Sequence, residues 1–93
     1  MNDTLANSID QLVAVLKSSG AKTVYVFGSA AKGTMRDDSD VDLAVSGLPP
    51  KNFFKALSAA SNVLERPINL IDLDEATPFT RYLIEEGELQ RVG

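Results

Sequence analysis

The sequence predicts a mixed α/β (α+β) fold, in which helices cover a small mixed β-sheet. Three short β-type segments alternate with amphipathic helical segments along the chain. The second and third β-type segments are separated by 22 residues that include a helix, which is enough for a parallel crossover. The chain has 93 residues, and we expect residues 1–93 to form a single domain.

The first half of the chain is predicted to begin with a helix over residues 4–19 and a strand over residues 22–27. Apolar residues of the helix recur at helical spacing: Leu5, Ile9, Leu12, Val13 and Leu16. The strand segment KTVYVF is rich in β-branched and aromatic residues. A short helical turn over residues 30–32 follows and ends at Gly33, and the polar residues 34–39 are expected to form a loop.

The middle of the chain is predicted to form a second strand and a second long helix. Residues 40–45 alternate polar and apolar side chains, which places Val41, Leu43 and Val45 on one face of a half-buried strand. Residues 51–66 form an amphipathic pattern, and Pro67 ends it. The side chains expected to face inward are Phe53, Phe54, Leu57, Ala60, Val63 and Leu64.

A third strand over residues 68–73 precedes a final helix. Thr77 and Pro78 are typical of an N-cap followed by proline in the first turn, and we expect the helix to run to Glu86 and stop at Gly87. No element is predicted over residues 88–93. The predicted order is therefore α-β-α-β-α-β-α, with the first two strands antiparallel, so that Ser29 approaches Asp40.

Composition excludes several kinds of chemistry. There is neither cysteine nor histidine, so disulfides, Ser-His-Asp catalysis and histidine–zinc sites cannot form within this chain. The formal charge of −4 disfavours nucleic acid as a partner of this chain acting alone. No apolar signal core is present at the N-terminus and no apolar run approaches the ~20 residues that cross a bilayer. We expect a cytoplasmic protein without membrane contact.

Asp40 and Asp42 are candidate metal ligands. Residues i and i+2 of a strand project from the same face, with Cα atoms ~6–7 Å apart. Two carboxylates so placed repel one another, and a divalent cation between them removes the repulsion. Mg²⁺ fits this arrangement because it prefers oxygen ligands and often shares its shell with substrate phosphates.

Gly28 and Ser29 form a candidate phosphate-binding turn. A glycine directly after a strand lets the backbone approach a ligand, and the free N–H groups and hydroxyl at a helix start can hold phosphate oxygens. Lys32 could also contact phosphate, although a plain surface role is equally compatible with its position. Each of these motifs is weak evidence alone, since Asp-x-Asp and Gly-Ser pairs are common.

Together the motifs resemble the nucleotidyltransferase signature of the DNA polymerase β-like superfamily. The pattern is Gly28-Ser29 after a strand, Gly33 four residues after Ser29, and Ser39-Asp40-x-Asp42-Leu43 opening another strand. Residues 66–87 are similar to the C-terminal portion of its minimal nucleotidyltransferase branch. The resemblance implies a polymerase β palm-like fold that binds Mg²⁺ with ATP or another nucleoside triphosphate. It implies transfer of a nucleoside monophosphate to a protein or small-molecule hydroxyl.

The resemblance also assigns roles to residues. Asp40 and Asp42 would be catalytic and would ligate the metal. The nucleotide would be bound by Gly28, Ser29, Lys32, Gly33 and Ser39. The family's third carboxylate corresponds to Asn69, which bears no charge and cannot accept a proton from the acceptor. Asp72 is a further candidate for this third position, although strand alternation turns it to the opposite face from Asn69.

Three functions remain open from the sequence. The first is a Mg²⁺-dependent nucleotidyltransferase. The second is a catalytically weakened antitoxin that neutralises a HEPN-type ribonuclease toxin by complex formation, as minimal nucleotidyltransferases frequently pair with such toxins. The third is a structural domain without a ligand. The small core also favours association with a protein partner or a second copy of the chain.

Overall fold

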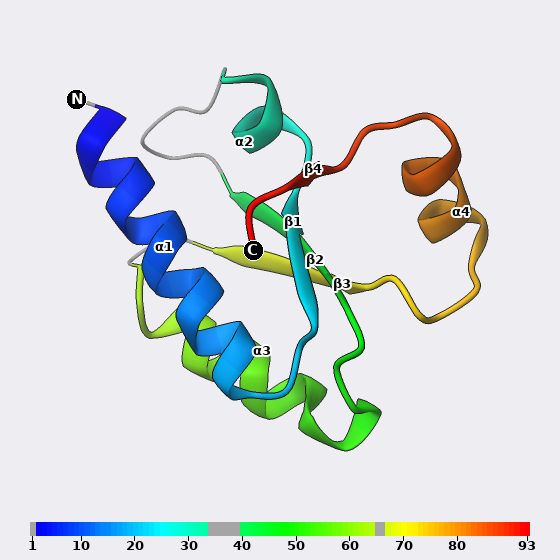
Figure 1. Ribbon diagram of the computed structural model, residues 1–93, viewed down its shortest axis with the longest axis horizontal. Helices are drawn as coiled ribbons and strands as arrows, with labels where there is room; N and C mark the ends of the chain where they lie inside the picture. The colour runs from blue at the N-terminus through cyan, green and yellow to red at the C-terminus, as the bar shows by residue number, and fades with distance from the viewer. Residues whose placement is uncertain (1, 34–39, 65–66) are drawn as a thin grey trace.

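The computed structural model describes residues 2–33, 40–64 and 67–93, with side chains from residue 7 onward. Four strands form one sheet in the order β3-β2-β1-β4 (Figure 1). The strands are β1 (Thr23–Val26), β2 (Val41–Ser46), β3 (Ile68–Asp72) and β4 (Gln90–Arg91). The helices are α1 (Asn2–Ser18), α2 (Ser29–Lys32), η1 (Pro50–Asn52), α3 (Phe53–Ser61) and α4 (Pro78–Glu85). The predicted loop over residues 34–39 lies outside the described residues.

The strand pairing confirms the predicted mixed sheet. β1 and β2 are antiparallel, with Val26 opposite Leu43. β2 and β3 are parallel, with Asp42 opposite Asn69. The connection between β2 and β3 (residues 47–67) contains α3 and has the length that a parallel crossover needs, whereas the connection between β1 and β2 (residues 27–40) is shorter.

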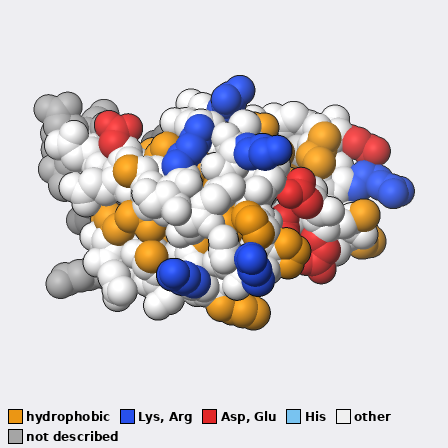
Figure 2. All heavy atoms as spheres, turned by 60° about the horizontal axis from the view of Figure 1, so that its bottom comes forward, with side chains coloured by type: hydrophobic (Ala, Val, Ile, Leu, Met, Phe, Trp, Pro, Cys, Tyr) orange, Lys and Arg blue, Asp and Glu red, His pale blue; other side chains and the backbone are white. Residues whose placement is uncertain are grey.

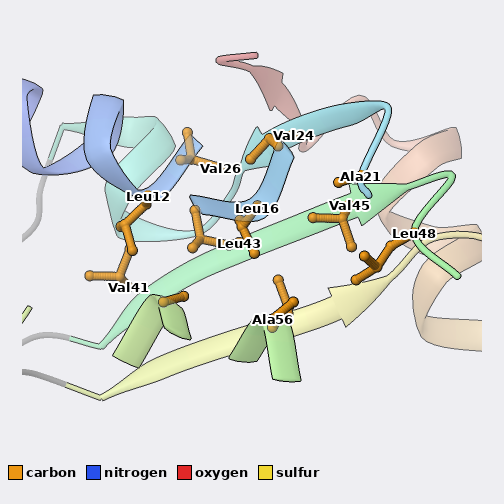
Figure 3. Packing of buried hydrophobic residues seen from close by; sticks show 12 residues of the cluster. Leu12, Leu16, Ala21, Val24, Val26, Val41, Leu43, Val45, Leu48 and Ala56 are labelled. Carbon is orange, nitrogen blue, oxygen red and sulfur yellow. The ribbon is translucent and has the colours of Figure 1, made fainter. Parts of the chain in front are cut away.

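The larger core lies between the sheet and the helices α1 and α3. Val41, Leu43 and Val45 are fully buried, as the alternation of β2 predicts. Figure 3 shows Leu12 and Leu16 of α1 extending toward these side chains, and Ala56 of α3 belongs to the same core. Because Val41, Leu43 and Val45 must stay in this core, the side chains of Asp42 and Ala44, which lie between them in β2, point to the other face of the sheet.

The opposite face of the sheet has a smaller core under α4. Phe27, Ala44 and Leu83 are buried together there, and Tyr25, Ile71, Leu73 and Leu89 pack around them. The Phe27 ring meets the Phe79 ring edge to face, with centroids 6.0 Å apart. Since Phe27 directly precedes Gly28, this contact connects the first turn of α4 with the end of β1 just before the Gly28–Ser29 turn.

The prediction of one long helix over residues 51–66 is wrong in two respects: the extent of the helix and the direction of the Phe54 side chain. The segment begins as the 3₁₀ turn η1 and ends as α3 at Ser61, and residues 65 and 66 lie outside the described part. Phe54, which was expected to face inward, is 78% exposed. The buried stripe of α3 runs through Ala56 and Ala60, and a residue two positions before Ala56 projects from the opposite side of the helix.

The predicted order also misses β4. The last residues return to the sheet, and β4 pairs antiparallel with β1, with Tyr25 opposite Arg91. The Val24 amide donates to the Gly93 carbonyl at 3.1 Å, and the Val92 amide donates to the Val24 carbonyl at 2.9 Å. Among the described helices, none is long and apolar enough to cross a membrane.

Candidate functional site

Two acidic side chains and one amide meet where β2 and β3 begin. Asp42 lies directly opposite Asn69 in the parallel pair. The Asn69 Nδ2 donates to Asp42 Oδ1 at 2.9 Å and to Asp40 Oδ2 at 3.4 Å. Asp40 is exposed and Asp42 is half-buried. The predicted pair of carboxylates therefore shares one side of the sheet, and Asn69 joins the two acids.

The core on the other face holds this arrangement in register. Val41 and Leu43 flank Asp42 and are fully buried between the sheet and α1 and α3. A slip of one residue would exchange the apolar and acidic faces of β2 and would place a carboxylate in the core. The burial of Val41 and Leu43 thus fixes the direction of the Asp42 side chain.

Gly28 lies against Asp42. Its backbone has φ 63° and ψ −141°, a combination that is essentially restricted to glycine. A Cβ atom at this position would be 2.4 Å from Asp42 Oδ2. The two residues are neighbours because the Phe27 amide continues the β1–β2 ladder by donating to the Asp42 carbonyl at 3.1 Å. Gly28 therefore leaves the space in which the Asp42 carboxylate lies.

The short helix α2 starts at Ser29, directly after Gly28. The Gly28 carbonyl accepts from the amides of Ala31 and Lys32, so the earlier amides of Ser29 and Ala30 precede the first intrahelical bond. Ser29 is half-buried and Lys32 is exposed. Gly33 ends α2 in the left-handed conformation with φ 73°, and its amide donates to the Ser29 carbonyl. Ser39, the fifth residue of the predicted nucleotide-binding set, lies outside the described residues.

Asp72 does not join the site. It lies opposite Val45, at the other end of β3 from Asn69. Its Oδ1 accepts from the Asp74 amide at 2.9 Å, and Asp74 Oδ2 accepts from the Gly47 amide at 2.7 Å. Strand alternation also turns Asp72 to the opposite face from Asn69. Asp72 and Asp74 thus stabilise the turns after β2 and β3, and of the two candidates for the third position, Asn69 is the one that contacts Asp40 and Asp42.

The donor set is suited to a divalent cation. The two carboxylates supply the oxygen ligands that Mg²⁺ prefers, and Asp42 Oδ2 faces the Gly28 turn rather than Asn69. Within residues 2–33, 40–64 and 67–93, no group of three or more acidic, cysteine or histidine side chains could hold a metal ion. A cation at this place would rely on Asp40 and Asp42 together with ligands from a bound substrate or water.

Two contacts at the site have no signal in the motifs. The Gly-Ser motif predicts phosphate binding by Gly28, and the structure adds that Gly28 makes room for Asp42. The antiparallel register places Phe27, rather than Gly28, opposite Asp42, so the approach of Gly28 depends on its own backbone angles. The second contact is that of the Phe79 ring with Phe27, which directly precedes the turn.

Residues 10–89 match the profile of the family described as polymerase beta, nucleotidyltransferase. No curated protein sequence matches the chain significantly. Among solved structures, a candidate minimal nucleotidyltransferase superposes with a TM-score of 0.74 at 24% identity, covering 98% of this chain and 93% of that chain. This similarity supports the same fold.

Two further solved structures with the same fold are toxin–antitoxin complexes. One contains AMP-PNP and gives a TM-score of 0.70 at 23% identity, covering 92% of this chain and 70% of that chain. The other is a tri-AMPylated HEPN toxin of Shewanella oneidensis in complex with MNT antitoxin. It gives a TM-score of 0.65 at 20% identity, covering 98% of this chain and 71% of that chain.

Proposed function

Because the chain belongs to the polymerase β-type nucleotidyltransferase family, we propose that it binds ATP with Mg²⁺ and transfers AMP to a hydroxyl group of a protein partner. The observation that carries the proposal is the arrangement of Asp40 and Asp42 beside the Gly28–Ser29 turn. The solved complex with AMP-PNP supports ATP as the nucleotide, and the AMPylated toxin supports a protein acceptor.

Each residue of the site has a defined task in this proposal. Asp40 and Asp42 hold Mg²⁺, which neutralises charge on the triphosphate when it is bound. The amides at the start of α2 and the Ser29 hydroxyl donate to phosphate oxygens. Gly28 lets the Asp42 carboxylate and the phosphates approach the same turn. Lys32, at the end of α2, adds a positive charge near the phosphates.

The transfer itself is a displacement at the α-phosphorus. The acceptor oxygen forms a bond to that phosphorus in line with the bond to the β-phosphate, which breaks, and pyrophosphate leaves with the electron pair. The acceptor proton must pass to water or to a group of the partner, because the Asn69 amide cannot accept it. We therefore expect slow transfer.

Transfer of radiolabel tests the enzymatic function. The protein is incubated with ATP labelled at the α-phosphate, Mg²⁺ and a HEPN-type toxin, and label on the toxin is measured. We expect label with the wild type and none with the Asp40→Asn/Asp42→Asn double variant, which keeps side-chain size and removes both charges. Asp10→Asn, at an exposed position on α1, is the matched control and should transfer as the wild type does.

The second candidate function is neutralisation of a toxin by binding alone. The observation that favours it is Asn69, whose amide binds both carboxylates and supplies no charge. In this case the toxin would bind tightly without acquiring label, and the Asp40→Asn/Asp42→Asn variant would bind it equally well. The same labelling experiment, combined with a pull-down of the complex, separates the two functions.

We place the contact with the partner on the exposed face of α4. Phe79 and Tyr82 lie three residues apart on one side of α4 and are 47 and 52% exposed, and large apolar side chains gathered on one side of a helix are typical of an interaction surface. Residues 72–88 contain six acidic residues and one arginine, which favours a partner with a basic surface. Tyr82→Lys removes the ring and adds a charge that a basic partner repels, so it should weaken toxin binding at least tenfold without changing ATP affinity. Phe54→Lys on α3 is the control and should change neither.

A further inference from the structure

We propose that this site holds one divalent cation rather than two, because Asn69 places a neutral amide, and no third carboxylate, beside Asp40 and Asp42. The proposal rests on the proposed function, since it concerns the number of cations that accompany the nucleotide. Nucleotidyl-transfer sites can hold two metal ions about 3.5–4 Å apart, one for the attacking oxygen and one for the leaving group. The contacts of Asp40, Asp42 and Asn69 indicate how many of these two metal ions the site of this chain can bind.

The two oxygens of Asp42 face different neighbours. Oδ1 accepts from the Asn69 Nδ2 at 2.9 Å, whereas Oδ2 lies toward Gly28, at the place where a Cβ atom would contact it. The same Nδ2 also reaches Asp40 Oδ2 at 3.4 Å. An amide N–H group is a donor and cannot coordinate a cation. The β3 side of the carboxylate pair is thus closed by a donor, and the side facing the Gly28 turn is available.

The charge of the site also indicates that one divalent cation is bound. Two carboxylates balance one divalent cation, and two such cations close together need further anionic ligands to offset their repulsion. In the part of the chain that the structure describes, Asp72 and Asp74 are the nearest acids along β3, and both accept backbone amides beyond its far end. Among residues 2–33, 40–64 and 67–93, a second cation would find no carboxylate near the site besides Asp40 and Asp42, and would have to rely on ligands from the substrate while facing the Asn69 amide.

Rotation of the Asn69 side chain would present its carbonyl oxygen instead of its NH₂ group. Without a cation, that rotation would bring the carbonyl oxygen against the Asp42 and Asp40 oxygens and would exchange two hydrogen bonds for repulsion. With a second cation present, the same rotation would offer a carbonyl oxygen as a ligand, but that oxygen is neutral and adds no charge to the two carboxylates. The partner's hydroxyl oxygen, which attacks the α-phosphorus, is then left without a metal ion of its own. Its proton must therefore pass to water or to a group of the partner.

Counting bound Mn²⁺ tests the proposal without measuring transfer. The protein is mixed with an equimolar amount of AMP-PNP, both well above their dissociation constant, and titrated with Mn²⁺ while electron paramagnetic resonance follows the free ion. We expect one Mn²⁺ per complex for the wild type, with the spectrum of an isolated ion. For Asn69→Asp we expect a second bound ion and a spin-coupled pair, because the new carboxylate supplies the missing charge.

Asn69→Ala is the matched control. It removes the amide donor without adding a charge, so it should still hold one ion. A second ion bound by Asn69→Ala would overturn the proposal that the missing charge sets the number. Two spin-coupled ions in the wild type would overturn the proposal and leave the proposed function intact, even if Asn69→Asp did not fold. A folded Asn69→Asp that holds only one ion would also overturn it. Absence of any Mn²⁺·AMP-PNP binding by the wild type would contradict the proposed function itself.

Discussion

At the scale of single residues, the site depends on the fit between Gly28 and Asp42. The backbone angles of Gly28 are strained for any other residue, and the Asp42 carboxylate fills the space that a side chain would need. The conformation of the turn and the position of Asp42, the proposed metal ligand, are thus coupled through one glycine.

Gly28→Ala should therefore damage both stability and nucleotide binding. The new Cβ must displace Asp42 Oδ2, which lies 2.4 Å away, and the backbone strain adds about 1–3 kcal/mol. We expect the free energy of unfolding, measured in urea, to fall by about that amount, and Mg²⁺-dependent AMP-PNP affinity to fall at least tenfold.

Gly87→Ala is the control for this change. Gly87 also has a positive φ of 66°, but nothing lies within 4 Å of its Cβ position. It should lose stability of about 1 kcal/mol from its backbone alone and retain nucleotide affinity. Equal nucleotide affinities for Gly28→Ala and Gly87→Ala would contradict the coupling of Gly28 to Asp42.

At the scale of elements, α4 is held by its first turn. The Thr77 hydroxyl accepts from the Thr80 amide at 3.1 Å, and the Thr80 hydroxyl accepts from the Thr77 amide at 3.0 Å. The buried Thr80 hydroxyl also donates to the Glu75 carbonyl at 2.7 Å. This reciprocal cap fixes where α4 begins and thereby the position of Phe79 on Phe27.

Thr77→Ala should remove the cap and lower the free energy of unfolding by about 1 kcal/mol. Thr77→Ser keeps the hydroxyl and should lie within about 0.5 kcal/mol of the wild type. Chemical denaturation followed by circular dichroism measures both changes. If Thr77→Ala were as stable as Thr77→Ser, the capping bonds would not stabilise α4 as described.

Most elements could be predicted because their patterns depend on local physics. The alternation in β2 and the Thr77-Pro78 start of α4 both follow from backbone geometry, and the structure confirms them. β4 was missed because Gln90 and Arg91 are exposed polar residues whose pairing depends on the distant strand β1. The outward direction of Phe54 was missed because the small side chains Ala56 and Ala60, rather than the aromatic ones, define the buried stripe.

Only part of the candidate site could be predicted from local patterns of this kind. The spacing of Asp40 and Asp42 indicates a common face without any tertiary information. The approach of Asn69 to both carboxylates depends on the parallel register of β2 and β3, which spacing cannot define. The clash that Gly28 avoids depends on the antiparallel register of β1 and β2 and on the side-chain direction of Asp42.

At the scale of the whole molecule, stability and recognition lie on different sides of the sheet. α1 and α3 cover the larger core, whereas α4 covers a smaller one and leaves apolar side chains exposed. Figure 2 shows several acidic side chains toward the side where α4 lies in Figure 1, with a basic side chain beside them, and further acidic atoms near the opposite end. The side with α1 and α3 thus contains the larger core, and the other side presents the proposed site and the proposed partner surface.

Leu43→Ala tests this division. Leu43 is fully buried on the central strand β2, and loss of a buried leucine side chain typically costs about 2–5 kcal/mol. A domain of this size has a total stability of roughly 5–14 kcal/mol, so the melting temperature should fall strongly. Phe54→Ala, which removes a larger but exposed side chain, should shift it little. Thermal unfolding of both variants checks the assignment, and comparable losses would place Phe54 in the core after all.

The most direct measurement of the central claim is calorimetric titration of AMP-PNP into the wild type and the Asp40→Asn/Asp42→Asn variant, each with and without Mg²⁺. We predict that the wild type binds AMP-PNP at least tenfold more tightly with Mg²⁺, and that the variant, folded as judged by circular dichroism, shows no such gain. Equal affinity of the wild type with and without Mg²⁺, or an undiminished gain in the variant, would contradict a site in which these two acids hold a divalent cation beside the Gly28–Ser29 turn.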